Sequence, residues 1–223
     1  LVYYADRWSD EPPRNGVYFN TQCEENGWTA GGISAAAVLL PEHPRNAHWN
    51  EAFKRWAINS VSTFRDEIEQ WPYVSTTTFH PDYTAENHAF VHPNYMTAGI
   101  TLRGQYALFA LMAGIDIPEQ ALSRNVEMYD RTIKAWALSD GIAAPLQGQD
   151  WWYNRQHGEL YCHAFMNVIH GDPEAALLER RSLDVVERLQ LSNDRGCLLE
   201  ENGEKYIVWA PSHQTAKEME FGS

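Results

Sequence analysis

Apolar residues recur at helical spacing along much of this chain, and Pro and Gly interrupt them at intervals. The segment 24–40 is rich in Ala, Val and Leu, which is typical of a buried helix, and Pro41 ends it. A second helix is predicted over 47–70, and Trp71-Pro72 ends it. Four aromatic residues share one stripe of this helix: Trp49, Phe53, Trp56 and Phe64.

Two further helical pairs are predicted. The first consists of 94–113 and 119–138, with Gly114 after the last helical residue and Pro118 just before the next helix. The second consists of 158–169 and 173–191.

The two ends of the chain differ from this helical pattern. Residues 1–21 are rich in Pro, Gly, Asp and Tyr, which predicts an irregular segment. Near the other end, Asn202-Gly203 lies between two apolar runs and predicts a β-hairpin over 197–209.

The sequence therefore predicts a single, mainly all-α domain over 1–223. Its helical part spans 22–192, and a β-hairpin and tail occupy 193–223. The helices form three hairpins with a period of about 65–70 residues. A cluster of polar and aromatic residues lies at the start of the first helix of each hairpin, at 24–28, 86–95 and 147–155. If these first helices run parallel, the three clusters lie together at one end of the helical hairpins and form one site.

Composition and charge narrow the function. Hydrophobic residues make up 44% of the chain and charged residues 21%, which is typical of a globular protein. Nine Trp and eleven Tyr provide flat apolar surfaces that stack on sugar rings, although the same residues also fill large helical cores. The net charge of −13 argues against nucleic acid and anionic membranes as partners.

Cysteine usage and targeting signals add little. Cys23, Cys162 and Cys197 have neither metal-site spacing nor a disulfide framework, and one bridge stays open as an alternative. No apolar stretch is long enough to span a bilayer, and the first residues lack a signal-peptide pattern. Because the chain begins with Leu1, we expect a processed or excised piece.

The adjacent Asn87 and His88 have the most direct chemical meaning. A neutral imidazole is a base near neutral pH, and an amide donates hydrogen bonds to an oxygen that gains negative charge. Together they predict removal of a proton from a carbon next to a carboxylate, with stabilisation of the enolate. The alternative is structural, because Asn and His in a loop also satisfy backbone groups at a helix start.

Asn87-His88 resembles the adjacent Asn-His of several (α/α)-toroid polysaccharide lyases, the superfamily of alginate, chondroitin and heparinase II/III-like lyases. Asp140-Gly141, followed by Gln147-Gly-Gln-Asp-Trp-Trp-Tyr153, resembles their Asp-Gly…Gln/Glu-Gly…Tyr stretch. The resemblance covers 22–192. It implies an incomplete toroid, because complete toroids have more hairpins and most carry a large β-sheet domain.

Two more segments are similar to parts of this superfamily. Arg155 with Tyr161 and His163 resembles an Arg…Tyr-x-His arrangement of the alginate-lyase branch. Glu24-Glu-Asn-Gly-Trp28, before an Ala-rich helix, looks like an early toroid segment.

The resemblance implies β-elimination on a glycan that contains uronic acid. Asn87 would neutralise the carboxyl group, and His88 or a tyrosinate would remove the C5 proton. Tyr153 or Tyr161 would protonate the leaving oxygen. Arg155, and with it Arg103, would supply local positive charge.

The partner implied is an anionic or neutral polysaccharide or oligosaccharide, which places the protein in a secreted or periplasmic location; self-association stays open. Residues from all three clusters and the helix that follows them are predicted to bind it: Glu25, Asn26, Trp28, His92, Tyr95, Gln147, Trp151, Trp152 and His163.

No cofactor is predicted. A divalent cation held by His88 and His92 with Asp82 or Glu86 is the alternative, since two His four apart share one face of a helix. Ala89 stands where a zinc protease has its general-base Glu, which argues against zinc hydrolysis.

Two other functions compete with the lyase hypothesis. A glycoside hydrolase on an (α/α) barrel needs two carboxylates across the sugar, and Glu24 or Glu25 with Asp150 would supply them. A non-catalytic helical scaffold that binds a glycan or a protein is the other. The chain contains no nucleophile elbow, phosphate-binding glycine loop or dinucleotide fingerprint.

Overall fold

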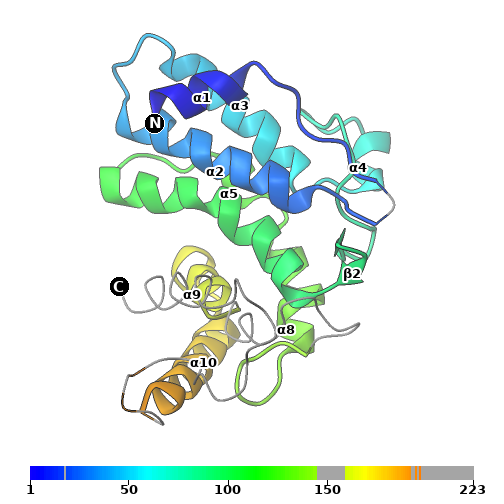
Figure 1. The fold of residues 1–223 in the computed structure, drawn as a ribbon, viewed down its shortest axis with the longest axis vertical. Coiled ribbons are helices and arrows are strands. Elements are labelled where there is room, and N and C mark those ends of the chain that lie inside the picture. Colours follow the sequence, from blue (N-terminus) through cyan, green and yellow to red (C-terminus); the bar gives the residue numbers. More distant parts are fainter. Residues whose placement is uncertain (18, 145–158, 192–193, 195, 197–223) are drawn as a thin grey trace. The chain divides into compact units, whose positions relative to one another are not determined.

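The computed structural model describes residues 1–17, 19–144, 159–191, 194 and 196. The chain divides into two compact units, Leu1–Ala135 and Trp136–Ser223, where the sequence predicts a single domain. The described residues are mainly helical, with one small two-stranded sheet, so the predicted all-α class is confirmed (Figure 1). The toroid stays a prediction. No helix in the described ranges has both the length and the apolar character needed to cross a membrane.

Two parallel helices, α2 (Cys23–Leu39) and α5 (Pro93–Ala113), form the centre of the first unit (Figure 1). Gly27 and Gly31 let their backbones approach closely. A Cβ at Gly31 would lie 2.6 Å from the carbonyl oxygen of Leu102. Near the helix starts, the Cys23 thiol lies 3.8 Å from the carbonyl oxygen of Tyr95. Both helices therefore begin at the same end of the unit, and both were predicted from the sequence.

Helix α3 (Asn46–Asn59) packs against α2 and contributes Trp49, Phe53 and Trp56 to the core. It is shorter than the predicted helix 47–70, which is wrong beyond residue 59. The chain breaks because the buried Asn59 amide accepts hydrogen bonds from the backbone N–H groups of Ser75 and Thr76. A separate short helix, α4 (Phe64–Ile68), follows.

The start of α4 explains another wrong prediction. Thr63 and Asp66 form a capping box that fixes where the helix begins. Phe64 is 57% exposed, so it does not share the buried stripe of α3.

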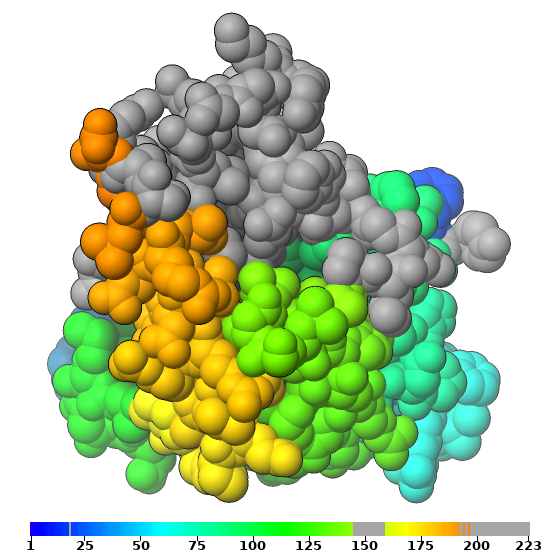
Figure 2. All heavy atoms as spheres, turned by 90° about the horizontal axis from the view of Figure 1, so that it is seen from below, coloured from blue at the N-terminus to red at the C-terminus, as the bar shows by residue number. Residues whose placement is uncertain are grey.

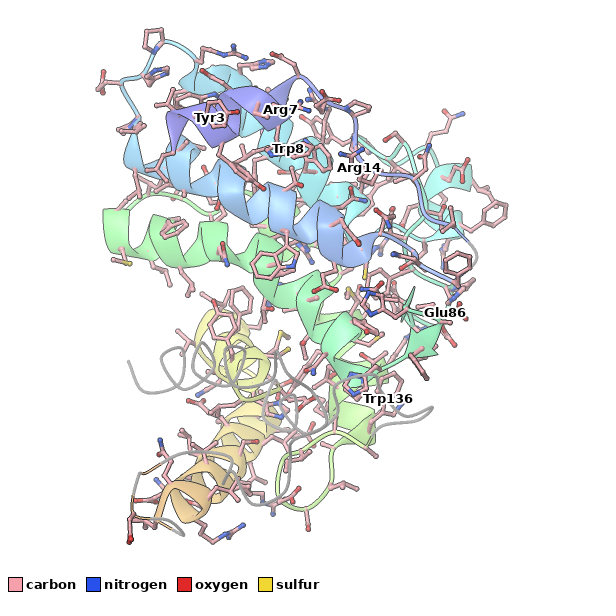
Figure 3. All side chains as sticks on the ribbon, in the orientation of Figure 1. Tyr3, Arg7, Trp8, Arg14, Glu86 and Trp136 are labelled. Atoms are coloured by element: carbon pink, nitrogen blue, oxygen red, sulfur yellow. The ribbon has the colours of Figure 1, made fainter. Side chains whose placement is uncertain are left out.

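The predicted irregular segment 1–21 contains a helix, α1 (Val2–Ser9), and the prediction is wrong for these residues. A helix of eight residues is marginal alone, and tertiary contacts hold this one. The indole of Trp56 donates to the carbonyl oxygen of Trp8 at 3.1 Å. The guanidinium groups of Arg7 and Arg14 lie over the Trp8 ring, at 4.9 and 5.3 Å from its centroid (Figure 3).

The predicted helix 119–138 is also wrong, because it is three short helices: α6 (Glu119–Leu122), α7 (Asn125–Arg131) and α8 (Ile133–Trp136). Arg124, at φ 64°, makes the first break, and its guanidinium donates to Asp66 at 2.5 Å. The buried Arg103 side chain donates to the carbonyl oxygens of Gln120 and Ser123 in the same turn. Side chains from other elements therefore hold the break.

The second unit contains the antiparallel helices α9 (Glu159–His170) and α10 (Pro173–Leu191), as predicted. Gly171, at φ 66°, turns the chain, and Asp172 accepts the backbone N–H of Glu174 at 2.8 Å. Their side chains form one continuous yellow-to-orange surface in Figure 2. The predicted β-hairpin 197–209 lies outside the described residues.

Candidate functional site

A tight hairpin carries the Asn-His pair. Strands β1 (Glu86–Asn87) and β2 (Phe90–Val91) pair antiparallel, with Asn87 opposite Phe90. His88 and Ala89 form the two-residue turn, at φ 50° and 66°. A turn with positive φ at both central residues normally contains Asn-Gly, because a Cβ is disfavoured there. Each non-glycine residue in this region costs about 1–2 kcal/mol, so the turn is strained.

The segment before α2 holds this turn in place. The backbone N–H of Ala89 donates to the carbonyl oxygen of Phe19 at 2.9 Å, and the backbone N–H of Thr21 donates to the backbone carbonyl oxygen of Glu86 at 2.8 Å. Figure 3 shows Glu86 at the hairpin. Strained turns persist where the surrounding structure fixes them, and such places are often functional sites.

Asn87 is fixed by a carboxylate on α2. Its amide nitrogen donates to Oε2 of Glu24 at 2.7 Å, and its side-chain oxygen accepts the backbone N–H of His88 at 3.0 Å. The Asn87 side chain is 4% exposed. The other Glu24 oxygen accepts the indole N–H of Trp28 at 3.3 Å, and Trp28 is 54% exposed. Two of the three predicted polar-aromatic clusters therefore meet at the starts of α2 and α5.

Tyr95 and two histidines lie beside the turn. The Tyr95 ring packs edge-on against His88 and His92, with ring centroids 6.4 and 5.8 Å apart. His88 is exposed, whereas Tyr95 and His92 are buried. Nδ1 of His92 accepts the backbone N–H of Asn94 at 3.1 Å, which caps α5. Nδ1 is therefore unprotonated, and the His92 proton lies on Nε2.

The site is acidic. Glu24 and Glu25 occupy the first turn of α2, and Glu86 precedes Asn87. None of these three carboxylates forms an ion pair with a Lys or Arg of the described chain. Oε2 of Glu25 is buried and accepts no hydrogen bond from any described residue.

Arg103 does not supply the positive charge predicted for the site. Its side chain is fully buried, and it also donates to the carbonyl oxygen of Gly99 at 2.8 Å and to Asn125. Burial lowers the pKa of this guanidinium to about 9. Arg103 therefore holds α5 against the break between α6 and α7.

Asn26 is fully buried, and its amide exchanges hydrogen bonds with the backbone of Arg14 and donates to the carbonyl oxygen of Asn59 at 3.0 Å. These contacts give Asn26 a structural role, and its predicted contact with substrate finds no support in them.

The second unit contains Tyr161 and His163 on α9. Tyr161 is part-exposed, and His163 is buried, with its Nε2–H donating to the carbonyl oxygen of Gly141 at 2.8 Å. Cys162 is buried and free, as is Cys23 in the first unit. The remaining predicted site residues lie outside the described residues: Gln147, Asp150, Trp151, Trp152, Tyr153 and Arg155.

The alternative cation site has little support in the described part of the chain. There, no three His, Cys, Asp or Glu side chains gather closely enough to hold a metal ion. Nδ1 of His92 is engaged by the Asn94 backbone, and His88 lies on a turn rather than on a helix.

Three contributors to the site were missed in the sequence. The sequence predicts no contact between Glu24 and Asn87, although Glu24 holds the Asn87 amide. Phe19 and Thr21 act through their backbone, so their side-chain identity gave no signal. The unusual His88-Ala89 pair in a two-residue turn was not recognisable before the hairpin was known.

Comparisons with known proteins assign no family. No family model, curated protein or solved structure matches this chain. Its function must therefore be argued from the chemistry of the site.

Proposed function

We propose that this chain is a polysaccharide lyase that cleaves glycans containing uronic acid by β-elimination. The observation that carries the proposal is the joint placement of Asn87, His88 and Tyr95. A buried amide donates a hydrogen bond to Glu24, an exposed imidazole follows it on a strained turn, and a phenol ring contacts that imidazole. These are the three groups that an elimination needs: an oxyanion donor, a base and an acid.

In the proposed reaction, the His88 imidazole removes the proton on C5 of the uronate residue. The electrons of that C–H bond form the C4–C5 double bond, and the bond from C4 to the glycosidic oxygen breaks. A tyrosine, for which Tyr95 is the candidate within the described site, protonates the departing oxygen. The second N–H of the Asn87 amide stabilises the enolate oxygen, which is worth about 3–4 kcal/mol in comparable sites.

The exposed Trp28 gives the site an apolar face for a sugar ring, and its indole is oriented by Glu24. Phe19, 55% exposed, is joined through its backbone to the turn that carries His88. The proposed partner is therefore a polysaccharide or oligosaccharide, and its class places the protein outside the cytoplasm, in a secreted or periplasmic location.

The direct test is a spectrophotometric assay of the purified chain on a panel of uronic-acid polymers. Elimination produces an unsaturated sugar, so absorbance near 235 nm rises with time. Asn87→Ala should lower this rate by about 10²–10³-fold. Asn15→Ala, an exposed asparagine in the N-terminal segment, is the matched control and should leave the rate unchanged. No rise on any polymer would reject the lyase assignment.

A specific observation favours one second candidate. The buried oxygen of Glu25 that accepts no hydrogen bond from a described residue is suited to a carboxylic acid that protonates a leaving oxygen, as glycoside hydrolases require. The alternative is therefore a hydrolase that uses Glu25 with a second carboxylate. New reducing ends without absorbance at 235 nm, abolished by Glu25→Gln, would establish it in place of elimination.

A further inference from the structure

The acidity of the site bears on its substrate, provided that the proposed lyase function holds. The nitrogen of Asn87 that would face the substrate lies 2.7 Å from an oxygen of Glu24. Any group bound by the second N–H of this amide therefore lies within a few ångströms of the Glu24 carboxylate. Glu25 is adjacent on the same helical turn, and Glu86 is adjacent to Asn87.

No Lys or Arg of the described residues pairs with these carboxylates. Arg103, the cation predicted for the site, is instead buried against the backbone carbonyls of Gly99 and Gln120. The whole chain carries a net charge of −13, so the long-range field has the same sign. A free uronate carboxylate on Asn87 would meet like charge at short range, which is unfavourable.

A neutral ester of the same sugar acid avoids this repulsion. Its carbonyl oxygen accepts a hydrogen bond from Asn87 as a carboxylate oxygen does, but it carries no charge. The C5 proton of an ester is also more acidic than that of a carboxylate, because removing it creates one negative charge rather than a second. An ester therefore needs less positive charge in the site for its elimination.

We infer that the site takes uronic-acid polymers in their esterified form, and that Glu24 sets this preference. Glu24 positions the Asn87 amide and at the same time disfavours a charged substrate. The chemical step is the elimination described above: the C5 proton moves to His88, the C4–O bond breaks, the leaving oxygen is protonated, and the ester group is unchanged. No oxidant, reductant or water is consumed.

The experiment compares two forms of one polymer. Homogalacturonan and polymannuronan are each prepared as free acids and as methyl esters of matched chain length. Rates at 235 nm are measured at neutral pH, with enzyme-free samples to subtract the spontaneous elimination of esters. We expect kcat/KM to be about tenfold higher on the ester than on the acid.

Glu24→Gln removes the charge and retains an oxygen that accepts the Asn87 N–H. It should lower the ester-to-acid ratio by about tenfold, mainly by raising the rate on the acid. The control is Glu119→Gln, an exposed carboxylate on α6, which makes the same change in net charge and should leave the ratio unchanged.

Binding separates this inference from the lyase proposal. Calorimetric titration of the His88→Asn variant with both oligosaccharide forms measures preference without turnover, and we expect the ester to bind about tenfold more tightly. Elimination on the acid at an equal or higher rate would overturn the inference and leave the lyase assignment intact. Ester-selective binding without elimination in the unmodified chain would reject the lyase assignment alone. Binding of neither form would overturn the inference.

Discussion

Two turns in this molecule each combine a histidine with backbone at positive φ, and they use the histidine in opposite ways. In the first unit, His88 itself occupies the strained position, at φ 50°, and its side chain is exposed. In the second unit, Gly141 occupies it, at φ 85°, and the buried His163 donates a hydrogen bond to the Gly141 carbonyl.

The two turns differ in whether the residue at positive φ suits that backbone conformation. At Gly141 the residue type fits the backbone, and the histidine stabilises the turn. At His88 the residue type opposes the backbone, and contacts from Phe19, Thr21 and Glu24 hold the turn around the histidine. A local conflict that the rest of the structure maintains is expected at a functional position. His163 therefore stabilises its turn, whereas in the proposed mechanism the turn at His88 holds the imidazole in position as the base.

The largest expected effect is on activity at the first turn. Asn is well tolerated at positive φ, so His88→Asn should keep the hairpin while removing the base. Elimination measured at 235 nm should fall by about 10²–10⁴-fold. Thermal denaturation should show no loss of stability.

His80→Ala provides the control, since His80 is an exposed histidine outside the site. Retained activity in His88→Asn would show that the imidazole is not the base. The strain at His88 would then have no link to catalysis.

The second turn should respond to Gly141→Ala with a loss of stability. An added Cβ would contact Ser182 and lie 2.6 Å from the carbonyl oxygen of Leu178, and the alanine would keep an unfavourable φ. We expect the free energy of unfolding to fall by about 3 kcal/mol in urea denaturation. Gly171→Ala, at φ 66° with open space around it, isolates the backbone part and should cost about 1 kcal/mol. Equal losses in the two variants would contradict the steric argument.

These turns also show what the sequence alone can predict. Helix ends marked by Gly and Pro, as at Gly114, were predicted because the signal lies in the local chain. The breaks at 60–63 and 123–124 were not, because contacts between residues far apart in the sequence hold them: Asn59 accepts the backbone N–H of Thr76, and Arg103 donates to the carbonyl oxygen of Gln120. Predicting them would require knowing which residues meet.

The candidate site divides in the same way. Asn87 and His88 were recognisable as neighbours in the sequence, and their chemistry follows from their side chains. The holding role of Glu24 depends on a contact between residues 63 positions apart, and that of Phe19 on a backbone carbonyl. The resemblance to toroid lyases pointed to the pair but carried no information about either contact.

A smaller effect tests whether the first turn is strained. Ala89→Gly should raise the free energy of unfolding by about 0.5 kcal/mol, because relief of strain slightly exceeds the entropy that glycine adds to the unfolded chain. Elimination should continue at the same rate. The opposite sign is expected for Ala47→Gly, at an exposed position in the first turn of α3, which should cost about 0.5 kcal/mol. A destabilised Ala89→Gly variant would show that the turn is not strained.

The smallest expected effect is the contribution of the buried His163 to the pH dependence of stability. Burial lowers the pKa of His163 below its ordinary value of 6.5, and the hydrogen bond to Gly141 offsets only part of this change. As the pH falls, His163 is therefore protonated at a higher pH in the unfolded chain than in the folded chain. Its contribution to stability is complete above about pH 6.5 and is lost as the pH falls from there towards the lowered pKa. His163→Gln keeps an N–H donor without the titration, so its urea midpoint should vary less between pH 5 and 8 than that of the unmodified chain. If the urea midpoints of the two proteins changed equally with pH, the protonation of His163 would not change on unfolding. The hydrogen bond to Gly141 would then be the remaining support for its structural role.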